Sequence, residues 1–217
     1  MGEELRYRAE VERIAVLLTF ASWATICCAQ YRLLPGKADS DGCFPQTPAR
    51  ICLGATSTAH CYAAPSGKDY IFGLEPKATA AGKLDGRPLT LFTATFSGCG
   101  SGTLTSVTLL TVKNGAFVNL LPEVHLTNQS EYKIWRLPQI SSLPILATAD
   151  FIWDFKAEET HFAAHRYHIE AFVFEAKCGR FLQRVRFDTA KKYPGSDEVD
   201  EIRVLEAEKP AILAKFR

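Results

Sequence analysis

The chain has 217 residues, of which 47% are hydrophobic and 23% charged, and its formal net charge is +1 at pH 7. A chain of this length and composition can bury a core of its own as one globular domain, with or without a leader and a tail. A near-neutral chain without blocks of basic residues lacks the electrostatic footprint of a nucleic-acid-binding protein or of a polybasic membrane surface. We therefore expect no nucleic-acid partner.

The first thirty residues have the pattern of a secretory leader. An apolar run from Ile14 to Cys28 follows three arginines, and it is shorter than the roughly 20 apolar residues of a membrane span. Cys27 and Ala29 are small residues at the positions that a signal peptidase reads before Gln30. We expect residues 1–29 to be a helical signal peptide.

Export follows from this interpretation. The mature chain is then expected in the periplasm or at the cell surface, without a transmembrane span. Four glutamates among the first twelve residues outnumber the arginines, so the N-terminal part of the leader has no net positive charge. A true translation start nearer Val11 would remove these glutamates. The alternative is a buried N-terminal helix of a cytosolic protein.

Residues 30–68 are rich in Gly, Pro, Ser, Ala and Thr and show neither a helical nor a strand period. They predict a loop-rich arm before a β-rich domain at residues 69–217. None of the seven cysteines is spaced as CxxC, which argues against zinc ribbons and thioredoxin-like motifs. In an exported chain they are disulfide candidates. Our preferred pair is Cys52 with Cys61; Cys43, Cys99 and Cys178 are candidates without an assignable partner, and at least one of the five is free or pairs between chains.

Period-2 alternation and turn signals dominate from residue 69 onward. Asp85-Gly86 and Asn114-Gly115 are strong hairpin turns, and Lys177-Cys178-Gly179 separates two further strand-like runs. Phe92 is expected on one face of its strand and Leu91 on the other. The expected strands cover residues 70–75, 89–96, 103–122 as a hairpin, 131–138, 144–155, 165–176, 180–190 and the start of 202–216, where one or two helical turns begin at Pro210.

The predicted fold is mainly β. We expect a single antiparallel domain of seven to ten strands, sandwich-like or a bent sheet, with minor helix. Both faces of the second half of 165–176 carry apolar residues, so that half is expected to be covered on both sides.

The chemistry that the sequence offers is concentrated just before residue 168. His161 and His165 have the spacing of two metal ligands on one helical face, and Glu158, Glu159 or His168 would supply a third. A shared metal ion needs these residues on a helical turn, because residues four apart on a strand lie roughly 13 Å from each other, too far to bind one ion. The alternative is a polar cluster at the start of a strand.

Catalytic signatures are weaker. The HExxH motif of zinc proteases is absent because Phe162 follows the first histidine. Acidic residues such as Asp150 and Asp154 would suit a glycosidase pair only at a suitable separation. No serine lies in a GxSxG elbow.

Several segments of the C-terminal part occur together in a familiar order: LFTATFSGCGSGTLTSVTLL, NLLPEVHLTNQSEY, TADFIWD, ETHFAAHRYHI and TAKKYPG. Together they resemble a group of exported bacterial proteins of unknown function. The resemblance covers about the last 130 residues, the size of one ordinary domain. It implies a bacterial, exported protein and brings no activity or catalytic residues; the cysteine arm lies outside it.

The leading functional hypothesis is a non-catalytic periplasmic or cell-surface protein that binds a ligand or an envelope protein, without a cofactor. The first alternative is a metal-dependent hydrolase, with zinc held by His161, His165 and a nearby carboxylate. The second is a structural envelope protein.

Overall fold

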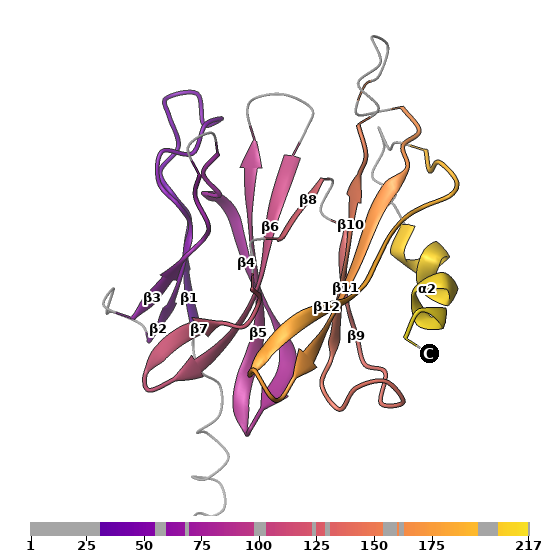
Figure 1. Ribbon diagram of the computed structural model, residues 1–217. Coiled ribbons are helices and arrows are strands. Elements are labelled where there is room, and N and C mark those ends of the chain that lie inside the picture. Colours follow the sequence, from indigo (N-terminus) through magenta and orange to yellow (C-terminus); the bar gives the residue numbers. More distant parts are fainter. Residues whose placement is uncertain are drawn as a thin grey trace, which may run out of the picture. The chain divides into compact units, whose positions relative to one another are not determined.

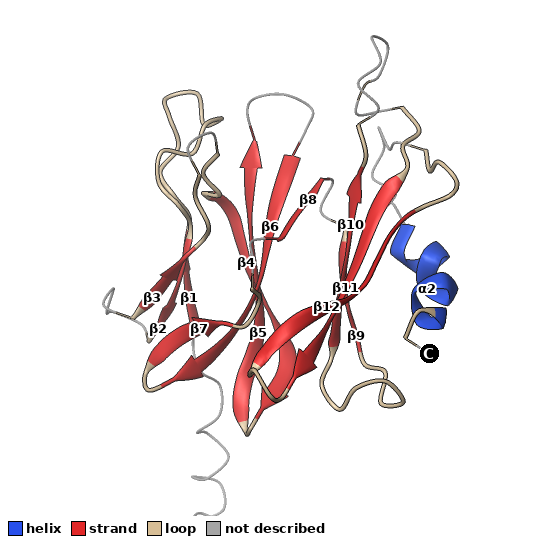
Figure 2. Ribbon diagram, viewed as in Figure 1, coloured by secondary structure: helices blue, strands red, loops and turns tan. Residues whose placement is uncertain are grey.

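The computed structural model describes residues 31–54, 60–67, 70–97, 103–122, 125–128, 131–153, 160, 163–194 and 204–216. The predicted signal peptide therefore lies outside the described residues. These residues form three antiparallel sheets and one helix, so the chain is mainly β as predicted (Figures 1 and 2). The strands are β1 (Tyr31–Leu34), β2 (Arg50–Leu53), β3 (Cys61–Ala63), β4 (Leu74–Leu84), β5 (Arg87–Ser97), β6 (Thr103–Lys113), β7 (Ala116–Asn119), β8 (His125–Asn128), β9 (Tyr132–Trp135), β10 (Ile145–Phe151), β11 (Tyr167–Glu175) and β12 (Arg180–Asp188), and the helix is α2 (Val204–Ala214).

The cysteine arm contributes a small sheet of its own. It is loop-rich as expected, but it also contains β1, β2 and β3, which pair in that order. The sequence did not predict these strands because they are three or four residues long, too short to display a period.

The five-stranded sheet has the order β4-β5-β6-β7, and β8 pairs with the first half of β6. The two predicted hairpin turns are confirmed. Asp85 and Gly86 have φ values of 49° and 77°, and Asn114 and Gly115 have 52° and 74°. Two successive positive φ angles are the geometry that a tight two-residue hairpin requires, and Asn, Asp and Gly tolerate it best.

The four-stranded sheet has the order β12-β11-β10-β9, and all its neighbours are antiparallel. A hairpin joins β11 to the edge strand β12 at the predicted turn before Arg180. The register of this hairpin shifts by one residue between Ala171 and Phe172, a β-bulge that decides which side chains of β12 face those of β11.

Three buried clusters hold the layers together. Phe92 of β5 forms a cluster with residues of the small sheet, among them Ile51. Leu91, on the opposite face of β5, forms a cluster with Phe172 and Phe181 of the four-stranded sheet. The five-stranded sheet is thus covered on both faces, which explains the run of seven buried residues within β5.

The outer face of the four-stranded sheet packs against α2. Ala149 and Ile169 share a cluster with Leu205 and Ile212 of the helix. The second half of β11 is therefore covered on both sides, as predicted, because Ala171 faces the helix cluster and Phe172 faces the five-stranded sheet.

Two elements differ from the prediction. The helix begins at Val204 and contains Pro210 in its interior, so the expected strand before Pro210 was wrong. The short apolar run before it predicted a strand, but the segment LEAEK is made of good helix formers and the helix extends through it. Residues 70–73 are not part of a strand of the five-stranded sheet. The backbone of Phe72 forms hydrogen bonds with Ala49 and Pro65 of the arm instead.

Candidate functional site

Two of the five predicted metal ligands lie in the described part of the chain. His165 and His168 flank the start of β11, whereas Glu158, Glu159 and His161 lie outside the described residues. The environments of the two described histidines are therefore the direct evidence on this region.

His165 is buried, with 1% of its surface exposed. Its ring stacks on Phe151 at a centroid distance of 4.6 Å and meets Trp153 edge-on at 5.4 Å. Nε2 lies 2.8 Å from the carbonyl oxygen of Thr160, and Nδ1 lies 3.3 Å from that of Ile152. Both ring nitrogens thus face backbone acceptors. This is the arrangement of a histidine that joins two loop segments to the end of β10.

His168 lies in a different environment, on the face of β11 directed away from α2. Its Nδ1 is 2.6 Å from Oδ1 of Asp188, and Nε of Arg186 donates to its Nε2 over 2.9 Å. A ring that accepts from Arg186 at Nε2 must carry its proton at Nδ1, where it donates to the carboxylate. The two partners therefore select one neutral tautomer.

The antiparallel register extends this contact into a row of polar side chains. Asp150 and Asp188 lie opposite His168 on the neighbouring strands, and Arg186 lies opposite Glu170. Directly opposite residues on antiparallel strands share one face of the sheet. Gln183 donates to Glu170 over 2.5 Å. We define the β10–β12 polar cluster as Asp150, His168, Glu170, Gln183, Arg186 and Asp188.

The cluster occupies the polar half of a face whose other half is core. Farther along the same face, Leu146, Phe172 and Phe181 are buried against the five-stranded sheet. The bulge after Ala171 marks the change from one half to the other. The same sheet thereby provides a rigid apolar base and a charged surface next to it.

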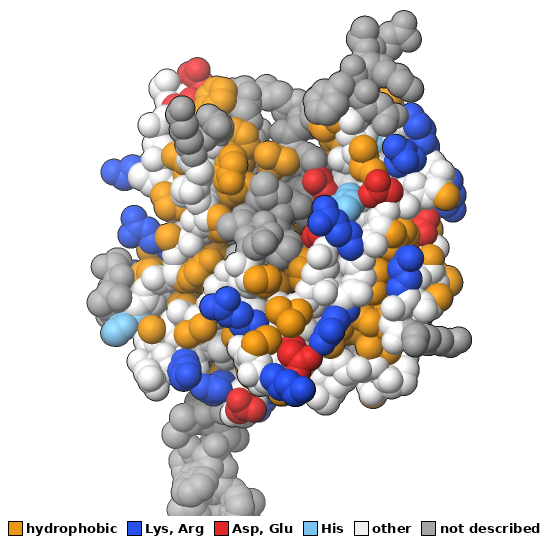
Figure 3. All heavy atoms as spheres, viewed as in Figure 1, with side chains coloured by type: hydrophobic (Ala, Val, Ile, Leu, Met, Phe, Trp, Pro, Cys, Tyr) orange, Lys and Arg blue, Asp and Glu red, His pale blue; other side chains and the backbone are white. Residues whose placement is uncertain are grey.

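The cluster reaches the molecular surface. Side chains of Arg186 and Asp188 are 65% and 50% exposed, against 28% for His168 and 19% for Glu170. Figure 3 shows acidic, basic and histidine side chains gathered over the β10–β12 strands. The cluster holds three acidic residues and one arginine beside the neutral His168, so both charge signs are present and the acids are in excess.

The chemical capacity of the described histidines is limited by their partners. A metal ligand needs a nitrogen lone pair aimed at the ion, whereas each described ring has a protein group at both nitrogens. Among the residues that the structure describes, no group of three or more His, Cys, Asp and Glu side chains is arranged to hold a metal ion. The metal hypothesis remains a prediction because three of its residues lie outside the described ranges.

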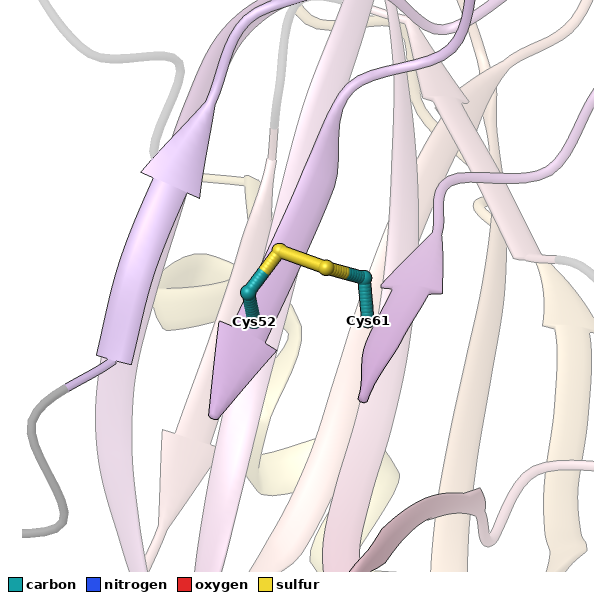
Figure 4. The surroundings of a disulfide bond; sticks show 2 residues. All are labelled: Cys52 and Cys61. Carbon is teal, nitrogen blue, oxygen red and sulfur yellow. A yellow bond between two sulfur atoms is a disulfide. The ribbon is translucent and has the colours of Figure 1, made fainter. Parts of the chain in front are cut away.

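The cysteines are distributed as follows. Cys52 and Cys61 form a disulfide between the neighbouring strands β2 and β3, which confirms the preferred pair (Figure 4). Cys43 is also disulfide-bonded, and Cys99 lies outside the described residues. Cys178 is an exposed free thiol in the β11–β12 turn.

A further titratable group escaped the sequence analysis. Glu131, immediately before β9, is 6% exposed. Its two carboxylate oxygens accept hydrogen bonds from the backbone N–H groups of Val204 at 3.2 Å and Leu205 at 2.6 Å. Burial raises the pKa of Glu131 to about 7. No local pattern signals this residue, since its partners lie more than seventy positions away.

No helix among the described residues has the length and hydropathy needed to cross a bilayer.

Comparisons with protein-family models, with curated proteins and with solved structures find no match to this chain.

Proposed function

We propose that this chain is an exported, non-catalytic binding protein that holds its ligand or envelope partner at the β10–β12 polar cluster. The observation that carries the proposal is the hydrogen bonding of the histidines. His165 has a backbone carbonyl oxygen beside each ring nitrogen, one of which accepts from the single N–H of the neutral ring, and His168 contacts Asp188 and Arg186. Protein atoms thus lie against both nitrogens of each ring, where a general base or a zinc ligand needs an open approach to its lone pair.

The exposed contacts of Arg186 and Asp188 suit reversible binding. Exposed ion pairs contribute only about 0–1 kcal/mol each because water competes for both partners. A ligand group that replaces one partner of Arg186 or Asp188 therefore displaces little stabilisation. The strands beneath hold the cluster in place, which lowers the entropic cost of ordering these side chains on binding.

The disulfide supports export. Structural disulfides persist in oxidising compartments and are rare in the cytosol. Cys52 and Cys61 join two strands of only four and three residues, and a covalent link adds to the stability of so small a sheet.

The test is a fragment screen by 1H–15N NMR, with sugars, amino acids and small carboxylic acids as probes. We expect shift changes from binding fragments to concentrate on β10–β12. Arg186→Gln should weaken this binding. The matched control is Arg180→Gln, which neutralises an exposed arginine at the other end of the same strand.

Two results would contradict the proposal. One is a set of binding fragments whose shift changes lie away from the cluster and are indifferent to Arg186→Gln. The other is turnover of a bound fragment, which would favour the hydrolase alternative.

A further inference from the structure

The N-terminus of α2 is held by a side chain from a distant part of the chain. The first N–H groups of a helix have no partner within it and are usually satisfied by a residue immediately before the helix. Here Glu131 supplies both acceptors, one oxygen to Val204 and one to Leu205. A single carboxyl group thus joins the helix terminus to the strand edge at β9.

This carboxyl group is buried, and its surroundings do not compensate a negative charge fully. Burial disfavours the ionised form, whereas the two backbone N–H groups and the charge of Lys133 favour it. Glu206 of the helix opposes ionisation by like-charge repulsion. Burial outweighs the favourable contacts, since it raises the pKa of Glu131 to about 7.

The remaining groups near the carboxyl are tyrosines and a second acid. Tyr167 of β11 and Tyr193 both interact electrostatically with Glu131, and burial raises the pKa of each well above its ordinary value. Tyr193 donates its hydroxyl to Glu208 of α2. Apart from Lys133, the described side chains named as interacting with Glu131 are thus tyrosines or acids, and neither Tyr167 nor Tyr193 titrates near neutral pH.

We propose that Glu131 is a pH-dependent latch that holds α2 on the four-stranded sheet in acid and releases it as the pH rises. In the docked state the carboxyl group lies inside the protein at the helix terminus. In an undocked state the same group is in water, where its ionisation is unhindered. Ionisation therefore favours the undocked state, and the apolar contacts of Leu205 and Ile212 oppose it.

The direction follows from proton linkage. Between about pH 4.5 and about pH 7, the docked carboxyl keeps its proton while the exposed one loses it. The undocked state then binds fewer protons, so the docking equilibrium weakens by about tenfold per pH unit, to a limit of about 300-fold over this window. Above pH 7 both states are ionised and the equilibrium no longer changes through this group.

Hydrogen exchange of the full chain measures this equilibrium. We expect the protection factors of amides in α2, corrected for the intrinsic rate, to fall by up to about 300-fold between pH 4.5 and pH 8. Amides of β5 and β6 serve as the reference for global opening and should keep their protection. Glu131→Gln keeps one carbonyl acceptor and cannot ionise, so its α2 protection should be independent of pH.

Two surface variants test the latch even if Glu131→Gln does not fold. Glu206→Gln removes a like charge and should move the midpoint of the α2 transition to lower pH. Lys133→Gln removes an opposite charge and should move it to higher pH. The proposal is overturned if wild-type α2 shows no pH-dependent loss of protection, if Glu131→Gln retains the same loss, if β5 and β6 open in parallel, or if the two neutralising variants do not shift the midpoint in opposite directions.

Discussion

At the scale of single residues, the two tyrosines near Glu131 differ in how their hydroxyl groups are satisfied. Tyr167 is 1% exposed, and its hydroxyl has no hydrogen-bond partner among the described residues. The hydroxyl of Tyr193 donates to Glu208. A buried polar group without a partner loses the free energy of its hydration without compensation. A buried group with a hydrogen-bond partner regains most of that free energy from the bond.

Removal of these two hydroxyls should therefore have opposite effects on stability. Tyr167→Phe is expected to leave the free energy of unfolding unchanged or to raise it by up to about 1 kcal/mol. Tyr193→Phe should lower it by about 1–2 kcal/mol because Glu208 loses its donor. Urea denaturation followed by circular dichroism measures both. Equal losses in the two variants would show that Tyr167 has a partner that the fold does not reveal.

Only part of the candidate site could be predicted from the spacing of residues in the sequence. The sequence singled out His168 but not Arg186 and Asp188, which lie 18 and 20 positions away. A hairpin extrapolated from its turn would pair His168 with Phe187. The bulge after Ala171 shifts the register by one residue and brings Asp188 opposite instead. Bulges are set by packing of the whole sheet, so the partners of His168 could not be derived from local spacing.

At the scale of elements, turn chemistry carried most of the successful predictions. Asn114-Gly115 and Asp85-Gly86 fixed two hairpins because few residues adopt successive positive φ angles. The alternation in β5 also assigned Phe92 and Leu91 correctly to opposite faces. The start of α2 was missed because its N-terminal partner, Glu131, belongs to another part of the chain.

The small sheet gives an element-scale prediction. The disulfide between Cys52 and Cys61 closes a loop with a sequence separation of 9. Loss of a cross-link of that length, as in the double variant Cys52→Ser/Cys61→Ser, should cost about 2–3 kcal/mol of stability through the entropy of the unfolded chain. Reversible urea denaturation measures this difference.

Cys178→Ser is the matched control. Its thiol is free and exposed, so stability should change by less than about 0.5 kcal/mol. A double variant as stable as this control would mean that the small sheet does not depend on its disulfide.

At the scale of the whole molecule, the sheets form layers that the sequence predicted only in outline. A mainly β, antiparallel fold follows from alternation, and residues 69–217 contain nine described strands, within the expected range. The covering of β5 on both faces depends on Ile51 and Phe72, which lie in or next to the arm. Contacts between segments so far apart leave no local signal, which is why a loop-rich arm was expected where a third layer exists.

Export is tested on the native protein. Intact-mass and peptide mass spectrometry should show a mature N-terminus near Gln30 and a linked Cys52–Cys61 peptide, because signal peptides are removed and disulfides form in the exported compartment. A native protein that begins at Met1 with all its thiols reduced would contradict export. Binding at the β10–β12 polar cluster would then have to be considered in the cytosol.

The central proposal, that His165 and His168 serve structure and binding rather than metal chemistry, is tested most directly by metal content. Elemental analysis of protein purified without chelators and dialysed against zinc should find far less than one zinc per chain, with no difference between wild type and His161→Ala. The reason is that His165 and His168 already have protein partners at both ring nitrogens. One zinc per chain, lost in both His161→Ala and His165→Ala, would contradict the account and support the hydrolase alternative.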